Sequence, residues 1–412
     1  MNNTEKRNSL YIISSKSISR FGNILFDYAN SVWLVNSTIN GSLLMAIYQS
    51  SESIIGIIFS LIGGLLSDSK SRKKILIISD LVSGVLCVFL GTLFYSKIFS
   101  IVYGILSVNI ILSILSSLSS PAFKSIIKEI VSKKQIGKLN SWLEVSSELT
   151  KIISPIISLS LVKFIGIQGA LIINGVTFFI SAFLTFLTQN ISKKEDHNIL
   201  QVQKQNNIRT IANNFIEGFN YLYNKKHIFI IICTAALINF LIAGYQLYLP
   251  FSNKAFNFVG INTYAMFLSL TPIGGITGAL FSTKLSSSIT INKLYIYIVM
   301  CGLPLCAIYP LSFTKNALIT GISIIFFNFF ETIFNIQFMT YIQQNIDDNY
   351  TGRVFSFIFS GALLFMPFGS FFFEHFTNVY SNFNYLIIGC AFVIISLLSF
   401  VLMQILGYKE KL

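Results

Sequence analysis

Three acidic side chains stand inside long apolar stretches of this chain, where a charge is costly. Asp27, Glu52 and Glu331 have no residue of opposite charge close to them in the sequence. Loss of water favours the neutral form of a carboxyl group, so such a residue can load and release a proton near neutral pH. We interpret Asp27, Glu331 and Glu52 as candidates for proton coupling. The alternative is that Ser, Asn or Tyr side chains hold each carboxylate by hydrogen bonds and that none of them titrates.

A second group of charged residues follows helical spacing. Glu144, Glu148 and Lys151 stand at i, i+4 and i+7, which places them on one face of a helix. Lys151 would then lie about 14 Å along the helix from its polar start. The group is either a substrate or coupling site, or an ion pair between Glu148 and Lys151 that removes the cost of a buried charge.

The composition defines the elements that must carry these residues. Of the 412 residues, 53% are hydrophobic and 11% are charged, and the mean hydropathy is +0.70. A membrane-spanning helix needs about 20 mostly apolar residues. The sequence therefore predicts an all-α polytopic membrane protein with twelve spans, near 12–35, 43–66, 75–95, 98–119, 142–164, 167–188, 228–249, 263–282, 294–311, 317–340, 354–376 and 385–406.

The basic residues indicate how the chain is oriented. The net charge is +13, but the Lys and Arg residues form short clusters between apolar runs, which is not the pattern of a nucleic-acid-binding domain. If the N-terminus is cytoplasmic, the outer loops carry only Lys97, Lys163, Lys254 and Lys315. We therefore expect a multi-pass protein of the bacterial inner membrane with both termini in the cytoplasm.

The longest polar stretch divides the chain into two sets of six spans. We expect an N-terminal half at 1–188, a cytoplasmic linker with an amphipathic helix at 189–227 and a C-terminal half at 228–412. Gly64-x-x-x-Asp68 is echoed by Gly278-x-x-x-Ser282, and the segment 137–141 is echoed by 352–356. The two offsets nearly match, which favours a parallel repeat of six plus six helices.

The loop after the second span carries the most informative motif. Its sequence from Gly64 to Lys74 is GLLSDSKSRKK, with Gly64, Asp68 and Arg72 at set positions. This pattern resembles the signature loop of the major facilitator superfamily, although serines replace one basic residue and one glycine. A helix N-terminus and Arg72 could both hold the Asp68 carboxylate. We predict a conformational latch formed by Gly64, Asp68, Arg72, Asp80, Gly352 and Arg353, in which Asp80 is a structural partner of the loop.

Further stretches are similar to one branch of that superfamily, which contains macrolide-efflux proteins and the enterobactin exporter. They are Ser120 to Val131, read as a loop, the segment Tyr350-Thr351-Gly352-Arg353, and a motif in the fifth span made by Ser154, Pro155 and Ser158. In the superfamily the fifth-span motif is associated with antiport, so the resemblance implies export. Small residues around Pro155 also permit tight helix packing.

These features lead to one principal hypothesis and two alternatives. We expect a secondary active transporter that exports hydrophobic or amphipathic small molecules, drug-like or macrolide-like, by proton antiport and alternating access. The alternatives are an exporter of a self-made siderophore or peptide, and a non-transporting membrane sensor or immunity protein. No phosphate-binding loop, nucleophile elbow or metal-ligand spacing occurs, so we expect no enzyme, cofactor or metal site. The expected partners are a small-molecule substrate, protons and the lipid bilayer, with no nucleic acid, and the chain is expected to be a monomer.

Overall fold

The computed structural model describes most of the chain. The described residues are 2–37, 40–69, 71–95, 101–132, 135–189, 219, 221–223, 225–282, 284–285, 290–346 and 351–406; the side chains of 37, 60–61, 63–69, 128, 137, 343, 351–357 and 359–363 are outside this set. The chain forms two compact units, Met1–His197 and Asn198–Leu412. Most of the predicted linker, including its predicted amphipathic helix, lies outside the described residues.

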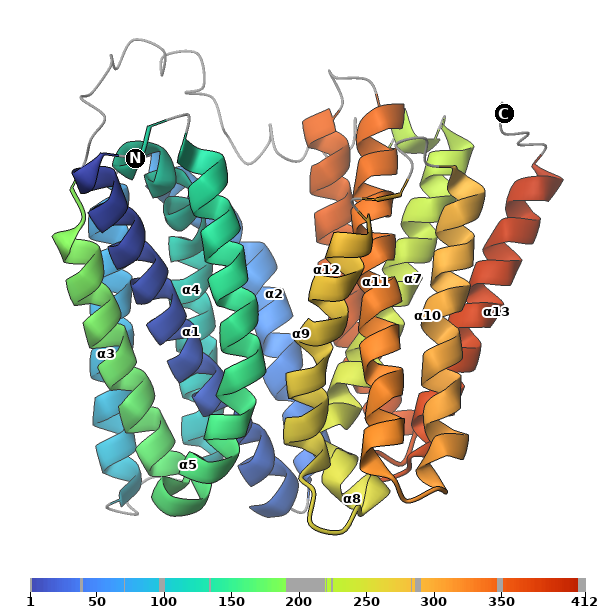
Figure 1. Cartoon of the computed structure of the whole chain (residues 1–412), viewed down its shortest axis with the longest axis horizontal. Coiled ribbons are helices and arrows are strands. Elements are labelled where there is room, and N and C mark those ends of the chain that lie inside the picture. Colours follow the sequence, from blue (N-terminus) through green and yellow to red (C-terminus); the bar gives the residue numbers. More distant parts are fainter. Residues whose placement is uncertain are drawn as a thin grey trace. The chain divides into compact units, whose positions relative to one another are not determined.

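The first unit is a bundle of long helices. Its elements are α1 (Asn3–Ser37), α2 (Gly41–Ser69), α3 (Arg72–Tyr95), α4 (Ile101–Ile130) and α5 (Ile136–Leu187). Figure 1 shows these helices running side by side along the unit, in blue to green. Each holds one of the predicted spans, except that α5 holds two.

One residue separates the two spans within α5. The 52-residue segment leaves helical geometry at Gly166, where φ is 63° and ψ is −170°. Residues that carry a Cβ rarely adopt a positive φ of this kind, so glycine suits the position. The predicted fifth and sixth spans are therefore antiparallel helices joined at a sharp reversal, which is visible at the lower end of α5 in Figure 1.

The second unit contains six long helices and two short ones. The long helices are α7 (Lys226–Tyr248), α9 (Thr263–Ser282), α10 (Ile291–Ser312), α11 (Ala317–Asn345), α12 (Thr351–Phe376) and α13 (Phe383–Ile405). The 3-10 turn η3 (Leu249–Phe251) and α8 (Ser252–Phe256) follow α7. With the two halves of α5 counted separately, the described residues form the twelve long helices of the predicted architecture.

The observed helices extend beyond several of the apolar runs. The segment from Ser120 to Ile130, read as a loop, is the last part of α4, and the loop after the second span is helical as far as Ser69. Gly352 and Arg353 also stand in the first turn of α12. Hydropathy detects only the apolar part of a helix, whereas polar turns can continue the same backbone hydrogen bonding outside the hydrocarbon.

The two units repeat one pattern of helix packing. In the first unit α1 packs on α5, α2 on α4 and α3 on α5; in the second, α7 packs on α12, α9 on α11 and α10 on α13. Glycines meet at corresponding contacts. A Cβ on Gly84 would lie 3.1 Å from Gly175 O, and a Cβ on Gly302 would lie 2.6 Å from Gly389 O. Small residues of this kind let helices approach closely in a membrane.

The outer surfaces of the bundles fit a lipid environment. Nine helices among the described residues are long and apolar enough to cross a membrane, and α5 counts once among them. α1 and α12 are not among these nine helices. The apolar sequence of α1 contains the charged residues Lys16, Arg20 and Asp27. Large apolar side chains are exposed along many helices, such as Phe89 at 58% and Leu398 at 66%. In water such surfaces would be costly, whereas hydrocarbon chains cover them without penalty.

Candidate functional site

A polar cavity of about 280 Å³ lies inside the first unit. It brings together the carboxylates of Asp27, Glu52 and Asp80 and the ammonium group of Lys16, from α1, α2 and α3. Its remaining lining is mainly serine and asparagine: Ser19, Asn23, Ser79, Ser83, Asn109, Ser113, Ser116, Ser117 and Ser119, with Phe26, Leu112, Leu115 and Phe178. Asp27 and Glu52 interact electrostatically in this polar cavity, and two such carboxyl groups can share a proton.

Asp27 is held by a tyrosine. Tyr48 Oη donates to Asp27 Oδ1 at 2.7 Å, and Asn30 Nδ2 donates to Tyr48 Oη at 3.2 Å. Asn109 Nδ2 donates to Tyr48 O at 3.0 Å and to Ser51 Oγ at 3.1 Å, which fixes the adjacent turn of α2. Tyr48 is 3% exposed, so the proton donor to Asp27 is set in a packed helix contact. Glu52 stands one helical turn further along α2 and interacts electrostatically with Asp27.

Asp80 interacts with residues of α5 and α1. Ser181 Oγ donates to Asp80 Oδ2 at 2.6 Å, and the charge of Lys16 attracts this carboxylate. Arg72 pairs with Glu129 of α4 at 2.8 Å, and the predicted partnership of Asp80 with the loop after α2 stays a prediction, because the side chains of 63–69 are outside the described set. Arg72 begins α3, whereas Asp80 stands eight residues, about 12 Å, further along the helix.

Lysine and arginine at the start of α3 connect three helices. Beside the pair of Arg72 with Glu129, Lys73 Nζ donates to Phe186 O and Thr188 O, both at 2.7 Å. A cation at the C-terminal end of a helix satisfies its last carbonyl groups and its dipole. The other predicted latch residues, Gly64, Asp68, Gly352 and Arg353, lie on described helices, but their side chains are outside the described set.

The N-terminal turn of α1 adds contacts that the sequence did not indicate. Asn8 is 1% exposed, and its Nδ2 donates to Ile130 O at 2.9 Å and to Gln189 O at 2.7 Å. Asn8 Oδ1 accepts from Gln189 N at 2.8 Å. One amide thus joins the ends of α4 and α5, and no local sequence pattern marks an asparagine for this role.

Glu5 lies next to this amide. Its Oε1 accepts from Ser132 N at 2.9 Å and its Oε2 from Asn2 N at 2.8 Å. Hydrogen bonds from the Ser132 side chain and main chain, with that from Asn2, lower the pKa of Glu5 from the usual 4.5 to about 2.

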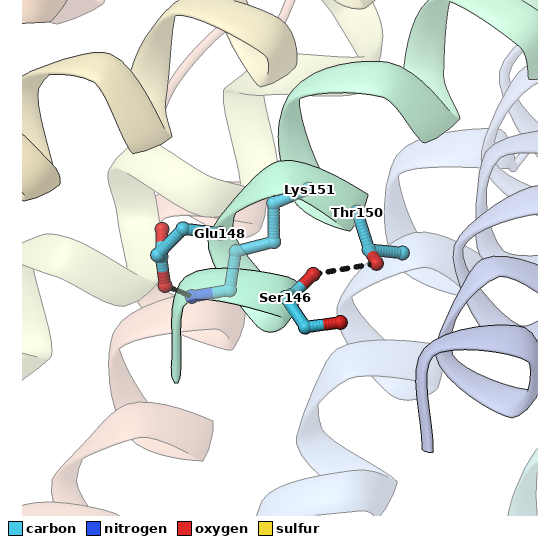
Figure 2. A network of polar contacts seen from close by, with 4 residues as sticks. All are labelled: Ser146, Glu148, Thr150 and Lys151. Carbon is cyan, nitrogen blue, oxygen red and sulfur yellow. Dashed lines mark hydrogen bonds and ion pairs between the residues drawn. The ribbon is translucent and has the colours of Figure 1, made fainter. Parts of the chain in front are cut away.

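The charged residues of α5 separate into two places. Lys151 Nζ lies 2.5 Å from Glu148 Oε1, so the ion pair predicted from the spacing forms. Figure 2 shows this pair together with Thr150, whose Oγ1 donates to Ser146 O at 2.8 Å. Ser146 Oγ also contacts Ser17 Oγ of α1. Glu144 instead lines a separate cavity with Lys16, Arg20 and Lys124.

The fifth-span motif is packed in the interior of the first unit. Ser154 and Ser158 are both 0% exposed, and Pro155 is also buried. Within the described residues the hydroxyl groups of both serines lack a hydrogen-bond partner. Their small volume is therefore their clearest structural contribution.

The second unit holds a larger cavity of different character. Its volume is about 610 Å³, and Glu331 is the one charged residue among its described lining residues. The rest are Ile232, Cys233, Ala235, Ala236, Leu237, Ile238, Asn239, Ile242, Ile298, Cys301, Phe334, Asn335, Phe338, Met339, Ile358, Phe365 and Phe392. Apolar pockets of this size with a few polar groups are typical of small-molecule sites.

A polar face of α4 is a sequence signal that could have located the first cavity. Ser113, Ser116, Ser117, Ser120 and Lys124 recur at three- and four-residue spacing. The first three line the polar cavity and the last two line the cavity that contains Glu144. Among the residues that the structure describes, no cluster of His, Cys, Asp and Glu could hold a metal ion.

Comparison with a family model decides the membership of the chain. Residues 16–370 match the model of the Major Facilitator Superfamily. The chain belongs to this superfamily. Because the match includes most of both units, it accounts for the repeated helix packing. No curated protein matches the chain significantly.

Solved structures of several other transporters have a similar fold. The nucleoside transporter NupG is 14% identical with a TM-score of 0.71 over 99% of this chain and 100% of its own. The POT family transporter PepTSo is 12% identical with a TM-score of 0.73 over 98% and 99%. A bacterial homologue of the iron transporter ferroportin is 14% identical with a TM-score of 0.70 over 96% and 98%.

Family membership establishes the general class of activity. The chain is a multi-pass membrane protein and a transporter rather than an enzyme. Members of the major facilitator superfamily bind small-molecule substrates, often together with protons. The relatives of known structure have diverse substrates and low identity, so they contribute the fold alone.

Proposed function

We propose that this transporter exports hydrophobic or amphipathic small molecules, drug-like or macrolide-like, by proton antiport and alternating access. The observation that carries the proposal is the contrast between the two cavities. Carboxylates gather in a polar cavity of the first unit, while a larger apolar cavity in the second unit has Glu331 as the one charged group among its described lining residues.

The apolar cavity supports a bulky apolar substrate. Phe334, Phe338, Phe365 and Phe392 line it, and aromatic faces bind varied apolar groups without strict hydrogen-bond geometry. Asn239 and Asn335 add polar atoms at its wall. Water leaves a cavity of this kind readily, so an amphipathic molecule gains binding free energy from its apolar part.

The polar cavity supports proton coupling. Asp27 is held by Tyr48 at 2.7 Å, and Glu52 lies close enough for electrostatic coupling with Asp27. Two carboxylates that repel one another favour the uptake of one proton between them. Lys16 stands opposite Asp80, so release of a proton can be balanced by a cation in the same space. In this proposal Asp27 and Glu331 change protonation during the transport cycle.

Everted membrane vesicles test the direction and the coupling together. With the lumen acidified, radiolabelled erythromycin is expected to accumulate inside vesicles that contain the full chain, and dissipation of the gradient should release it. Asp27→Asn should reduce gradient-driven accumulation at least about tenfold, corresponding to loss of a coupling group. Glu374→Gln, at the end of α12 and outside the lining of both cavities, is the matched control and should transport normally.

The alternatives give different results in the same vesicles. Accumulation of a siderophore or peptide but not of erythromycin would favour the exporter of a self-made metabolite. Saturable erythromycin binding with no flux under any gradient would favour a sensor or immunity protein. Flux that is independent of the gradient, in both the natural chain and Asp27→Asn, would refute proton coupling.

A further inference from the structure

A third cavity, of about 400 Å³, lies in the first unit and is lined by three cationic side chains. Lys16 and Arg20 come from α1, Lys124 from α4 and Glu144 from α5. In the described part of the chain, none of these four residues forms an ion pair within 4.0 Å. The cavity therefore has three cations and one carboxylate with free hydrogen-bonding capacity.

The cavity is built by matching faces of three helices. Its lining residues recur at helical spacing: Lys16, Ser17 and Arg20; Ser120, Phe123, Lys124 and Ile127; Asn140, Leu143, Glu144 and Ser147. Ile127 belongs to a buried hydrophobic cluster, against which Phe123 and Leu143 also pack. Lys16 Nζ lies 4.8 Å from the ring centre of Phe123. The cavity is thus lined partly by packed apolar side chains and partly by cations, hydroxyl groups and an amide.

The depth of Arg20 makes its lack of an ion-pair partner among the described residues significant. Arg20 stands eight residues into the predicted first span, about 12 Å along the helix. An unpaired guanidinium at such depth is costly, and membrane proteins usually pair it or use it to bind a ligand. The guanidinium fork also binds carboxylate and phosphate groups with two parallel hydrogen bonds.

Lys16 connects this cavity with the polar cavity. It lines both, and its charge is attracted by Asp80 and repelled by Arg20. An anion between Lys16 and Arg20 would screen their repulsion and compete with Asp80 for Lys16. Binding at the third cavity therefore changes the electrostatic balance around the carboxylates of the first.

We propose that the cavity lined by Lys16, Arg20 and Lys124 binds the phosphate or carboxylate group of a small anionic molecule, either free in water or as the headgroup of an anionic lipid. Arg20 provides the main contact, Lys16 and Lys124 add charge, and Ser120, Asn140 and Ser147 complete the hydrogen bonds. Glu144 opposes binding and limits its strength. This site does not depend on the proposed direction, substrate or proton coupling of transport.

Phosphate binding to the full chain in phosphatidylcholine nanodiscs tests the free-anion form of the proposal. Inorganic phosphate should raise the melting temperature of the protein above its value in chloride at equal ionic strength. A titration with phosphate then gives an apparent Kd. Arg20→Gln should weaken this affinity about tenfold, as loss of a charge-assisted hydrogen bond predicts. Glu144→Gln should strengthen it several-fold. Lys163→Gln, which removes an exposed charge outside the cavity, is the matched control and should leave the affinity unchanged.

Lipid retention tests the headgroup form. Phosphatidylglycerol should remain bound to the purified natural chain in native mass spectra and be lost from the double variant Arg20→Gln/Lys124→Gln. Size-exclusion profiles and melting temperatures without ligand establish that the variants are folded. Either form of binding, with the opposite effects of Arg20→Gln and Glu144→Gln on its strength, supports the site. Absence of both forms, or equal weakening by Lys163→Gln, overturns it.

Discussion

Asn8 and Gln189 exchange two hydrogen bonds across 181 positions of sequence. Asn8 Nδ2 donates to Gln189 O at 2.7 Å, and Gln189 N donates to Asn8 Oδ1 at 2.8 Å. The same amide reaches Ile130 O at the end of α4. The N-terminal part of α1 is therefore hydrogen-bonded to the residues that follow the last helix of the first unit.

Removal of the Asn8 amide should destabilise that unit. Asn8→Ala breaks three hydrogen bonds and leaves groups at two helix ends without partners, which we expect to cost about 3 kcal/mol. Melting temperatures of purified protein measure the loss. Asn316→Ala, which removes an exposed N-terminal cap of α11, is the comparison and should cost about 1 kcal/mol. An equal or smaller effect of Asn8→Ala would contradict the role of this residue.

Glu5 should make the stability of the N-terminal contact depend on pH. Because its pKa in the folded chain is about 2 and its usual pKa is 4.5, the folded state binds the proton less readily than the unfolded state. The stabilisation is complete above pH 4.5 and is lost as the pH falls towards 2. Stability measured across this range should decline less steeply in Glu5→Gln than in the natural chain, and parallel curves would exclude the effect.

Tyr48 should support transport through its hydrogen bond to Asp27. Tyr48→Phe removes the donor at 2.7 Å while keeping the ring in its buried place, so gradient-driven transport should slow about tenfold. Initial rates in everted vesicles provide the measurement. Tyr103→Phe, on the exposed surface of α4 at 70% exposure, should have no effect. A normal rate for Tyr48→Phe would separate this contact from the transport cycle.

The buried serines of α5 should tolerate loss of their hydroxyl groups but not added volume. Ser154→Ala and Ser158→Ala remove hydroxyls that have no partner among the described residues, so stability should change by no more than about 0.5 kcal/mol or rise slightly. Ser154→Leu should cost about 2 kcal/mol because the site is 0% exposed. Thermal unfolding of the three variants checks the pattern; a large loss in either alanine variant would reveal a hydrogen bond.

Hydropathy and helical spacing are sufficient to predict the membrane-spanning helices and one contact between side chains. The run at 263–282 coincides with α9, and the pair of Glu148 with Lys151 forms as the i, i+3 spacing predicted. Both results depend on local sequence, since burial in lipid selects apolar length and three residues along a helix return to nearly the same face.

Contacts between distant helices could not be predicted in this way. The sequence predicts Asp80 as a partner of the loop after α2 because it lies early in the third span, but its hydrogen bond to Ser181 of α5 could not be foreseen. Sequence gives the depth of a residue in a span but not which neighbouring helix its side chain faces. For the same reason the sequence presents the lysines and arginines only as markers of orientation, and it does not indicate that Lys16, Arg20 and Lys124 meet in one cavity.

The reversal at Gly166 has a consequence for how the chain is made. A single non-helical residue joins the two spans of α5, so almost no polar segment has to be carried across the bilayer between them. No long hydrophilic loop between the two spans has to cross the membrane, so translocation of such a loop cannot slow their insertion. During biosynthesis these two spans can therefore leave the insertion machinery as one preformed helical hairpin, ahead of the linker that follows.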